Sequence, residues 1–151
     1  MQSKSYFRIF SKQIYSSLLM VIMCGQSTYG EETGKIVIRV LGLKSSNGFV
    51  RFGLFNSEES FPKKNMVIQK GAHRITNYQC EFVIEGVSPG DYAVAVGHDK
   101  NGNGKIDRFL GYPLESVGVS GYSKRLWSKP SYKKSKFSID GQKKIIEIPI
   151  F

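Results

Sequence analysis

From Lys35 onward, apolar residues recur at every second position, which is the period of a β-strand with one buried face. The clearest run places Ile36, Ile38 and Val40 on one side of an extended chain. Helical spacing is nearly absent after this point, and turn signals rich in Gly, Pro, Asn and Ser separate the apolar runs. The pattern predicts an all-β domain rather than an α/β domain, in which strands would alternate with helices.

The apolar runs predict about seven strands in roughly 120 residues, which fits a single antiparallel β-sandwich of two sheets. The runs at 35–41 and 50–54 are separated by a Ser-Ser-Asn-Gly turn and are expected to pair as a hairpin. The other predicted strands are 66–75, which is weak and interrupted at Gly71, 78–87, 92–96, 132–139 and 145–150. Residues 56–65 are expected to form a loop with one helical turn near its start, and Phe61 is expected to fill the edge of the core. The Gly-rich stretch 108–130 is aperiodic, which predicts a long connection without regular structure.

The first thirty residues have the composition of a secretory signal. Lys4, Arg8 and Lys12 form a basic start, residues 14–24 are uncharged and rich in Leu, Ile and Met, and Gly30 lies near a suitable cleavage point. The apolar stretch is about eleven residues long, shorter than the roughly twenty that a membrane-spanning helix needs. We therefore expect residues 1–30 to be a signal peptide and residues 31–151 to be one secreted or periplasmic domain.

The two cysteines allow two further expectations. Cys24 follows Val-Ile-Met, but Met23 is larger than the small residue that precedes a lipidated cysteine, so lipid anchoring at Cys24 is the less favoured outcome. Cleavage near Gly30 leaves Cys80 alone, which excludes an intramolecular disulfide in the exported chain. Because Cys80 lies in an apolar alternating run, a buried and inert thiol is expected.

The chain is strongly basic, with a formal net charge of +10. Removing residues 1–30 takes away three of its 22 basic residues and no acid, which leaves a net charge of +7. The excess is concentrated near the C-terminus, in Lys124, Arg125, Lys129, Lys133, Lys134, Lys136, Lys143 and Lys144. This cluster could bind an anionic glycan, a lipid or an acidic envelope protein, or it could be a solvated basic face. Nucleic acid is not expected as a partner of an exported chain without a recognition motif, and a monomer is expected.

Several aromatic residues accompany this basic region. Tyr112, Tyr122, Trp127 and Tyr132 could form a platform for sugar rings, or they could pack in the core or form an exposed apolar patch. The first possibility would give the domain a binding role through its basic and aromatic C-terminal region.

The most specific local motif is the stretch 99–107, Asp-Lys-Asn-Gly-Asn-Gly-Lys-Ile-Asp. It places oxygen-bearing side chains at alternating positions, and Ca²⁺ takes six to eight oxygens at about 2.3 to 2.6 Å from such turning segments. In the EF-hand pattern, Asp99, Asn101 and Asn103 take the first three side-chain positions, Lys105 offers its backbone carbonyl, and Asp107 takes the ninth position.

The last ligand of the EF-hand pattern is missing, because Leu110 stands where a bidentate glutamate is needed. Glu115 could fold back to complete the shell. The predicted Ca²⁺ ligands are therefore Asp99, Asn101, Asn103, Lys105, Asp107 and Glu115. The alternative is a turn without an ion, since the two Asn-Gly pairs at 101–104 also favour tight turns and Asp99 could cap neighbouring amides.

No constellation points clearly to catalysis. His98, Asp99 and Ser120 could be drawn as a hydrolase triad, but the chain lacks the nucleophile elbow that supports such an assignment. A glycosidase pair of Asp107 and Glu115 competes with their use as ligands. A zinc site lacks Cys and His ligands. We therefore expect a protein without enzymatic activity.

Three short runs carry a resemblance to a known family. They are Pro-Gly-Asp-Tyr-Ala-Val at 89–94 leading into His-Asp-Lys-Asn-Gly-Asn-Gly-Lys-Ile-Asp at 98–107, then Gly-Tyr-Pro-Leu-Glu at 111–115, then Gly-Val-Ser at 118–120. The chain resembles the uncharacterised secreted proteins grouped as domain of unknown function 2141. The resemblance implies a transthyretin-like or immunoglobulin-like sandwich in the bacterial envelope or outside it, and it implies no established activity.

Overall fold

The computed structural model describes residues 32–124 and 128–151, so the predicted signal peptide and Trp127 lie outside the described residues. In chain order the elements are β1 (Gly34–Leu41), β2 (Phe49–Phe55), the 3-10 turn η1 (Lys64–Met66), β3 (Gln69–Arg74), β4 (Cys80–Val87), β5 (Gly90–Asp99), β6 (Arg108–Phe109), β7 (Tyr112–Pro113), β8 (Val117–Val119), α1 (Tyr132–Ser135), β9 (Phe137–Ile139) and β10 (Lys143–Pro149).

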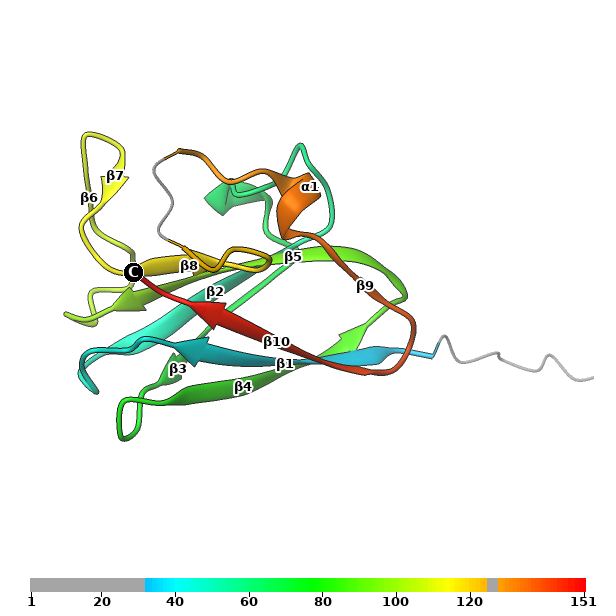
Figure 1. Ribbon diagram of the computed structural model, residues 1–151, viewed down its shortest axis with the longest axis horizontal. Coiled ribbons are helices and arrows are strands. Elements are labelled where there is room, and N and C mark those ends of the chain that lie inside the picture. Colours follow the sequence, from blue (N-terminus) through cyan, green and yellow to red (C-terminus); the bar gives the residue numbers. More distant parts are fainter. Residues whose placement is uncertain (1–31, 125–127) are drawn as a thin grey trace, which may run out of the picture. The chain divides into compact units, whose positions relative to one another are not determined.

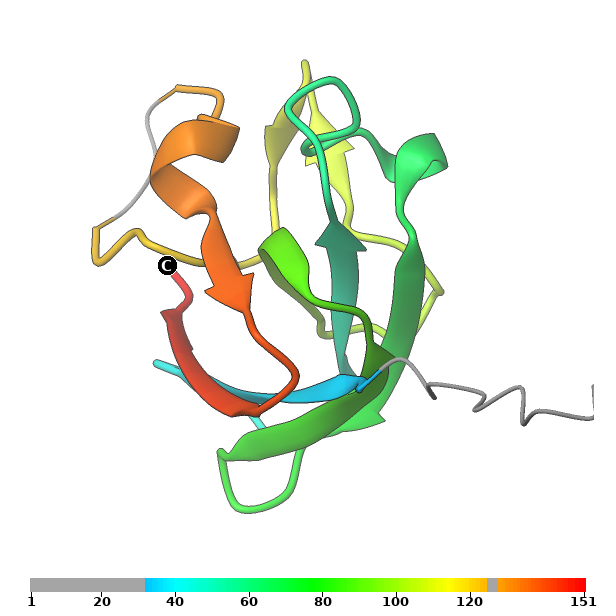
Figure 2. The same cartoon turned by 90° about the vertical axis from the view of Figure 1, so that its right-hand side faces the viewer.

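The strands form two main sheets, which confirms the all-β prediction (Figures 1 and 2). One sheet has the order β10-β1-β4, and the other has the order β3-β2-β5-β8, with β9 also pairing with β5. The short strands β6 and β7 pair only with each other. Strand β5 lies in the middle of the larger sheet, so it is held on both sides at the end from which the candidate site extends.

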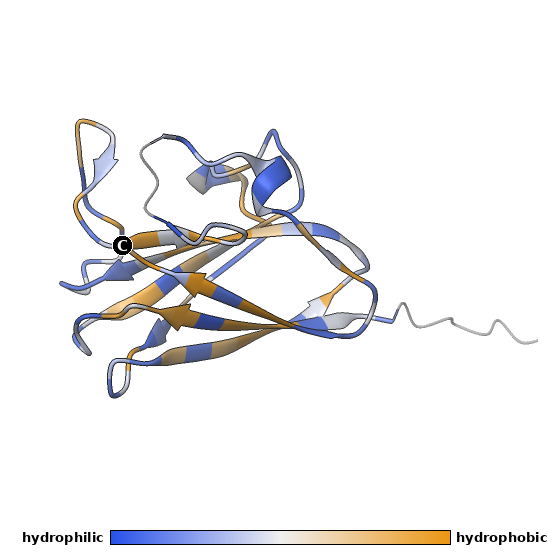
Figure 3. Ribbon diagram, viewed as in Figure 1, coloured by the Kyte–Doolittle hydropathy of each residue, from blue (hydrophilic) through white to orange (hydrophobic). Residues whose placement is uncertain are grey.

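The core lies between the two sheets and follows the alternation in the sequence. Ile36 and Ile38 of β1 point inward with Ile84 of β4, and they pack in one cluster with Val50 and Leu54 of β2. Phe61, predicted to fill an edge of the core, is 2 % exposed and packs in a second cluster with Phe55, Ala93 and Val119. Figure 3 shows apolar colour alternating with polar colour along β1, β4 and β10, as expected for strands with one buried face.

The predicted hairpin between the first two strands is wrong. Strand β1 pairs with β4 and β10, whereas β2 pairs with β3 and β5 in the other sheet. The turn between β1 and β2 therefore crosses from one sheet to the other. Alternation fixes which face of a strand is buried, but two strands that bury the same kind of face can lie side by side or opposite each other.

The prediction of a wholly antiparallel sandwich also needs correction. Strands β1 and β10 pair in parallel, with Lys35 opposite Lys143 and Leu41 opposite Pro149. A parallel pair requires a connection that returns the chain to the same end of the sheet. Here β9 pairs with β5 of the larger sheet, and the chain then passes to the free edge of β1 in the smaller sheet.

Three segments differ from their sequence predictions. Strand β3 passes through Gly71, which pairs with Phe52, so the predicted interruption is absent there. Strands β6, β7 and β8 lie within 108–119, where no regular structure was predicted, because pieces of two or three residues are too short to show a period. The segment 132–139 begins with the one-turn helix α1 and only then becomes a strand, since Lys136 N–H donates to Tyr132 O.

Cys80 is buried and is a free thiol, as predicted. Burial raises its pKa to about 11, so the thiol stays protonated and unreactive at neutral pH. Within the described part of the chain, no helix has the length and apolar character needed to cross a membrane.

Candidate calcium-binding loop

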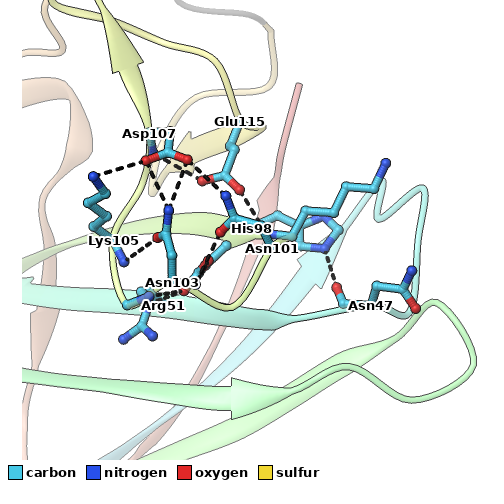
Figure 4. A network of polar contacts seen from close by, with 11 residues as sticks. Asn47, Arg51, His98, Asn101, Asn103, Lys105, Asp107 and Glu115 are labelled. Carbon is cyan, nitrogen blue, oxygen red and sulfur yellow. Dashed lines mark hydrogen bonds and ion pairs between the residues drawn. The ribbon is translucent and has the colours of Figure 1, made fainter.

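The candidate loop extends directly from the end of β5 (Figures 1 and 4). Asp99, the last residue of β5, is its fixed point. The Asp99 side chain is fully buried. Its Oδ2 accepts hydrogen bonds from Arg51 Nε at 2.6 Å and from Gly104 N at 3.0 Å, while its Oδ1 accepts from Asn103 N at 3.1 Å. Burial opposes ionisation of this carboxyl, but the bonds from Arg51 and the two backbone amides outweigh it and lower the Asp99 pKa.

A second carboxylate, Asp107, closes the loop from the other end (Figure 4). Asn101 Nδ2 donates to Asp107 Oδ2 at 2.9 Å, and Asn103 Nδ2 donates to both Asp107 oxygens at 3.0 and 3.1 Å. Lys105 Nζ lies 3.5 Å from Asp107 Oδ1. The bonds from the two asparagines, with a smaller contribution from Lys105, lower the Asp107 pKa. The carboxylate is therefore ionised and surrounded by the side chains that the sequence singled out.

The two asparagines also organise the backbone of the loop. Asn101 Oδ1 accepts from Asn103 N at 3.1 Å, and Asn103 Oδ1 accepts from Lys105 N at the same distance. These contacts are Asx turns, in which a side-chain oxygen replaces a backbone acceptor two residues earlier. These turns account for the alternating spacing of the asparagines. They also direct the side-chain Nδ2 of Asn101 and of Asn103 toward Asp107.

Glu115 folds back onto the loop, as the sequence predicted. Its Oε1 accepts from Lys100 N at 2.8 Å, and its Oε2 accepts from Asp107 N at 3.1 Å. One carboxylate therefore ties together the start and the end of the loop. Leu110, which occupies the EF-hand position of the missing glutamate, lies away at the tip of the β6–β7 hairpin and is 82 % exposed.

Sequence reasoning missed Arg51, and it predicted the Ser-Ser-Asn-Gly turn before β2 without connecting that turn to the loop. Arg51 lies in β2, between Phe and Val residues of an otherwise apolar strand, and this isolated charge was the available signal. The turn contributes Asn47, whose carbonyl lies 2.8 Å from Nε2 of the buried His98. These contacts join the loop to β2, so the site is built on two neighbouring strands of the larger sheet.

The atoms of the loop that could bind a cation are carboxylate, side-chain amide and backbone carbonyl oxygens. Within the described residues, no three His, Cys, Asp or Glu side chains converge closely enough to hold a metal ion. A cation at this loop would depend on amide and carbonyl oxygens from Asn101, Asn103 and Lys105 in addition to carboxylates, and such a set suits Ca²⁺ better than a transition metal. Because each carboxylate also accepts N–H donors, the same network stabilises the turn without an ion.

The residues of the possible hydrolase triad have separate partners. His98 contacts the Asn47 carbonyl, Asp99 pairs with Arg51, and Ser120 Oγ donates to Ser135 O at 2.6 Å. Ser120 Oγ also accepts from Val94 N at 3.0 Å. These bonds fix β5 and the segment after β8, so they account for the buried polar residues structurally.

Comparison with known proteins tests the resemblance across the domain. The model of a family described as "Uncharacterized protein conserved in bacteria (DUF2141)" matches residues 38–147. The chain belongs to this family. The matched range runs from β1 into β10 and includes the loop and Glu115, so the DUF2141 resemblance inferred from three short runs is confirmed. No curated protein and no solved structure matches the chain.

In the basic and aromatic C-terminal region of this DUF2141 domain, the described lysines are exposed, whereas two of the tyrosines pack against the fold. Tyr122 and Tyr132 are half-buried against the Phe61 cluster, and Tyr132 Oη donates to Asp91 O at 2.8 Å. Lys136 Nζ lies 2.6 Å from Asp91 Oδ2. The two tyrosines therefore pack in the core, which was the alternative to a sugar platform, whereas Trp127 lies outside the described residues.

Asp91 connects this region to β5 and should make stability depend on pH. Ser138 Oγ donates to Asp91 Oδ1 at 2.6 Å, and the bonds from Lys136 and Ser138 lower the Asp91 pKa. A depressed carboxyl pKa contributes stability that is present above the unfolded value near 3.9 and is lost as the pH falls through the folded value.

An Asp91→Asn variant is therefore expected to lose less stability than the native protein when the pH is lowered from about 5 to about 3. Denaturant unfolding at a series of pH values measures the difference. Glu59→Gln, which changes an exposed carboxylate outside this cluster, is the control. Parallel pH profiles for the native protein and Asp91→Asn would contradict the assignment.

Proposed function

We propose that this DUF2141 domain is an exported β-sandwich protein without enzymatic activity whose loop 99–107 binds Ca²⁺. The observation that carries the proposal is the position of Glu115, whose carboxylate folds back onto the amides at both ends of the loop. The signal-like composition of residues 1–30 supports export to the periplasm or the exterior. Free Ca²⁺ reaches millimolar levels around extracellular modules, which use sites of matching affinity.

The charges around the loop favour weak rather than tight binding of Ca²⁺. Asp99, Asp107 and Glu115 supply three carboxylates near the loop, but Arg51 already neutralises Asp99 at 2.6 Å. The remaining ligands, Asn101, Asn103 and the Lys105 carbonyl, are neutral. Few ligand charges and two competing cations, Arg51 on Asp99 and Lys105 on Asp107, predict a dissociation constant on the order of 10⁻⁴ to 10⁻³ M.

The ion would act structurally, by adding a positive charge where Asp107 and Glu115 approach each other. These two residues flank the β6–β7 hairpin, and Leu114 N donates to Asp107 O at 2.9 Å across its base. An ion there would add to the hold of Glu115 on the two ends and so help to order the segment 108–130, which includes the hairpin. The ion would thus have a structural role, which is to stabilise the loop.

Calcium is expected to raise the melting temperature of the purified protein. At about ten times the dissociation constant, one site adds about 1.4 kcal/mol, or about 3–6 °C for a domain of this size. Magnesium at the same concentration is expected to do less, because it keeps its water ligands more strongly. Differential scanning calorimetry in chelator and in each cation measures the shift.

Glu115→Gln is expected to remove most of the calcium response, while Glu59→Gln, an exposed carboxylate far along the chain, keeps it. A melting temperature that does not change up to about 10 mM Ca²⁺, well above the expected dissociation constant, would favour the ion-free turn. A response that survives in Glu115→Gln would reject Glu115 as a ligand.

A further inference from the structure

The β6–β7 hairpin and the residue after it expose four large apolar side chains. Phe109, Leu110, Tyr112 and Leu114 are 65, 82, 70 and 69 % exposed. All four lie within six residues of a hairpin that extends away from the two main sheets, and its turn is apolar in colour (Figures 1 and 3). Isolated exposed apolar residues are ordinary, but a contiguous group on a projecting element indicates a contact surface.

The turn of this hairpin breaks the usual relation between sequence and turn type. Phe109 pairs with Tyr112, so Leu110 and Gly111 form a two-residue turn, and both have positive φ, +49° and +85°. Such turns favour Asn-Gly, because a bulky side chain in the left-handed region is strained. The turn between β3 and β4 also has positive φ, +51° at Asn77 and +60° at Tyr78, so Leu110 and Tyr78 are the two large side chains in the left-handed region among the described residues.

Leu110 gains no packing within the domain to offset this strain, since it is the most exposed of the large apolar residues in the described chain. Residues that break a local rule without a structural gain tend to lie at functional sites. The leucine therefore points to a partner outside the domain that buries it.

Charge around the hairpin distinguishes between possible partners. Lys100, Lys105 and Arg108 are exposed on the loop and the hairpin, where they outnumber the two partly buried acids Asp107 and Glu115, and Arg108 also donates to Gly111 O at 3.1 Å. A second copy would bring the same excess of positive charge against this surface, and residues 31–151 carry a net charge of +7. Self-association through the hairpin is therefore opposed by repulsion, whereas an anionic surface is attracted.

The arrangement of side chains matches a membrane interface. Aliphatic and aromatic groups at the tip can enter the acyl region, and a tyrosine ring prefers the level of the head groups. Basic residues at the base can contact anionic head groups, each contributing attraction within a Debye length. We propose that the β6–β7 hairpin docks this protein on the surface of an anionic phospholipid bilayer.

This docking requires no ion, because Glu115 already holds both ends of the hairpin through Lys100 N and Asp107 N. The experiment can therefore distinguish a failure of membrane docking from a failure of calcium binding. Co-sedimentation of the purified exported domain, residues 31–151, with vesicles is run once in chelator and once in calcium, because the basic and apolar residues 1–30 would bind anionic vesicles themselves. The vesicles contain phosphatidylglycerol and phosphatidylcholine, or phosphatidylcholine alone.

Leu110→Asn is the decisive variant, because asparagine suits the left-handed backbone while it removes the apolar tip. We expect the melting temperature to stay equal or rise, and the partition onto phosphatidylglycerol vesicles to fall by about tenfold or more. Val83→Thr is the matched control, since Val83 is 47 % exposed on β4 and threonine also favours strands. Its partition should equal that of the native protein.

Loss of partition in Leu110→Asn with normal partition in Val83→Thr, in chelator or in calcium, supports the docking role even if calcium leaves the melting temperature unchanged. Native protein that fails to sediment with phosphatidylglycerol vesicles in both conditions overturns it. Equal partition of the native protein and Leu110→Asn overturns it as well. So does a concentration-dependent dimer that Leu110→Asn abolishes, because the hairpin would then bind a second copy.

Discussion

An Arg51→Met variant is expected to lose about 2–4 kcal/mol of unfolding free energy in chelator, because it leaves the buried Asp99 carboxylate without its counter-charge. The distance from Arg51 Nε to Asp99 Oδ2 is 2.6 Å, and the Asp99 side chain is 0 % exposed. Arg51 itself is 31 % exposed, and Asn103 and Gly104 still donate to Asp99, so the value lies at the lower end for a buried pair. Chemical denaturation monitored by circular dichroism measures the loss.

The matched control is Lys35→Met at the Lys35–Glu85 ion pair. That pair has a similar distance, 2.8 Å, but its side chains are 58 and 66 % exposed. Exposed pairs contribute about 0–1 kcal/mol, because water already solvates both charges. Similar losses in the two variants would show that burial of Asp99 is not the source of the effect.

Arg51→Met also separates the two interpretations of the loop, a Ca²⁺ site and a turn without an ion. Arg51 places a positive charge on Asp99, where it competes with a cation for the carboxylate. If the loop binds Ca²⁺, Arg51→Met should gain a larger rise in melting temperature from calcium than the native protein does. If the loop is a turn without an ion, the variant stays destabilised at every calcium concentration.

Local features of the fold and the site could be predicted from the sequence. The period-two run at Ile36, Ile38 and Val40 identified a buried strand face, because alternation is a local property of an extended chain. The loop at 99–107 and the return of Glu115 were also predictable, since the residues concerned lie within 17 positions of one another. Phe61 was predicted to fill the edge of the core because it is a large apolar residue within a polar loop, and it is buried.

Pairings between distant segments could not be predicted in the same way. The contact between Arg51 and Asp99 joins residues 48 positions apart, and it exists only because β2 lies beside β5. The parallel pairing of β1 with β10 joins the first strand of the domain to the last, at the edge of the smaller sheet. Neither choice leaves a periodic signal, because sheet order is decided by packing across the whole core.

Gly48→Ala is expected to cost about 3–5 kcal/mol, because the turn before β2 lies against the backbone of the candidate loop. Gly48 has a φ of +78°, and a Cβ at this position would lie 2.0 Å from Asp99 O and 2.8 Å from Lys100 O. Both contacts are with backbone atoms, so neither can be relieved by rotating a side chain. Relief would require moving the end of β5 away from the Asn47 carbonyl that contacts His98.

Gly86→Ala isolates the steric part of this effect. Gly86 has a similar φ, +69°, but a Cβ there would meet no atom within 4 Å. Alanine at Gly86 therefore pays only the cost of the left-handed backbone, about 1–2 kcal/mol. The difference between the two variants measures how firmly the turn holds the loop, and it should be accompanied by a weaker calcium response in Gly48→Ala alone. Equal losses would mean that the turn can move aside, and Asp99 would then be positioned by β5 and Arg51 without the turn.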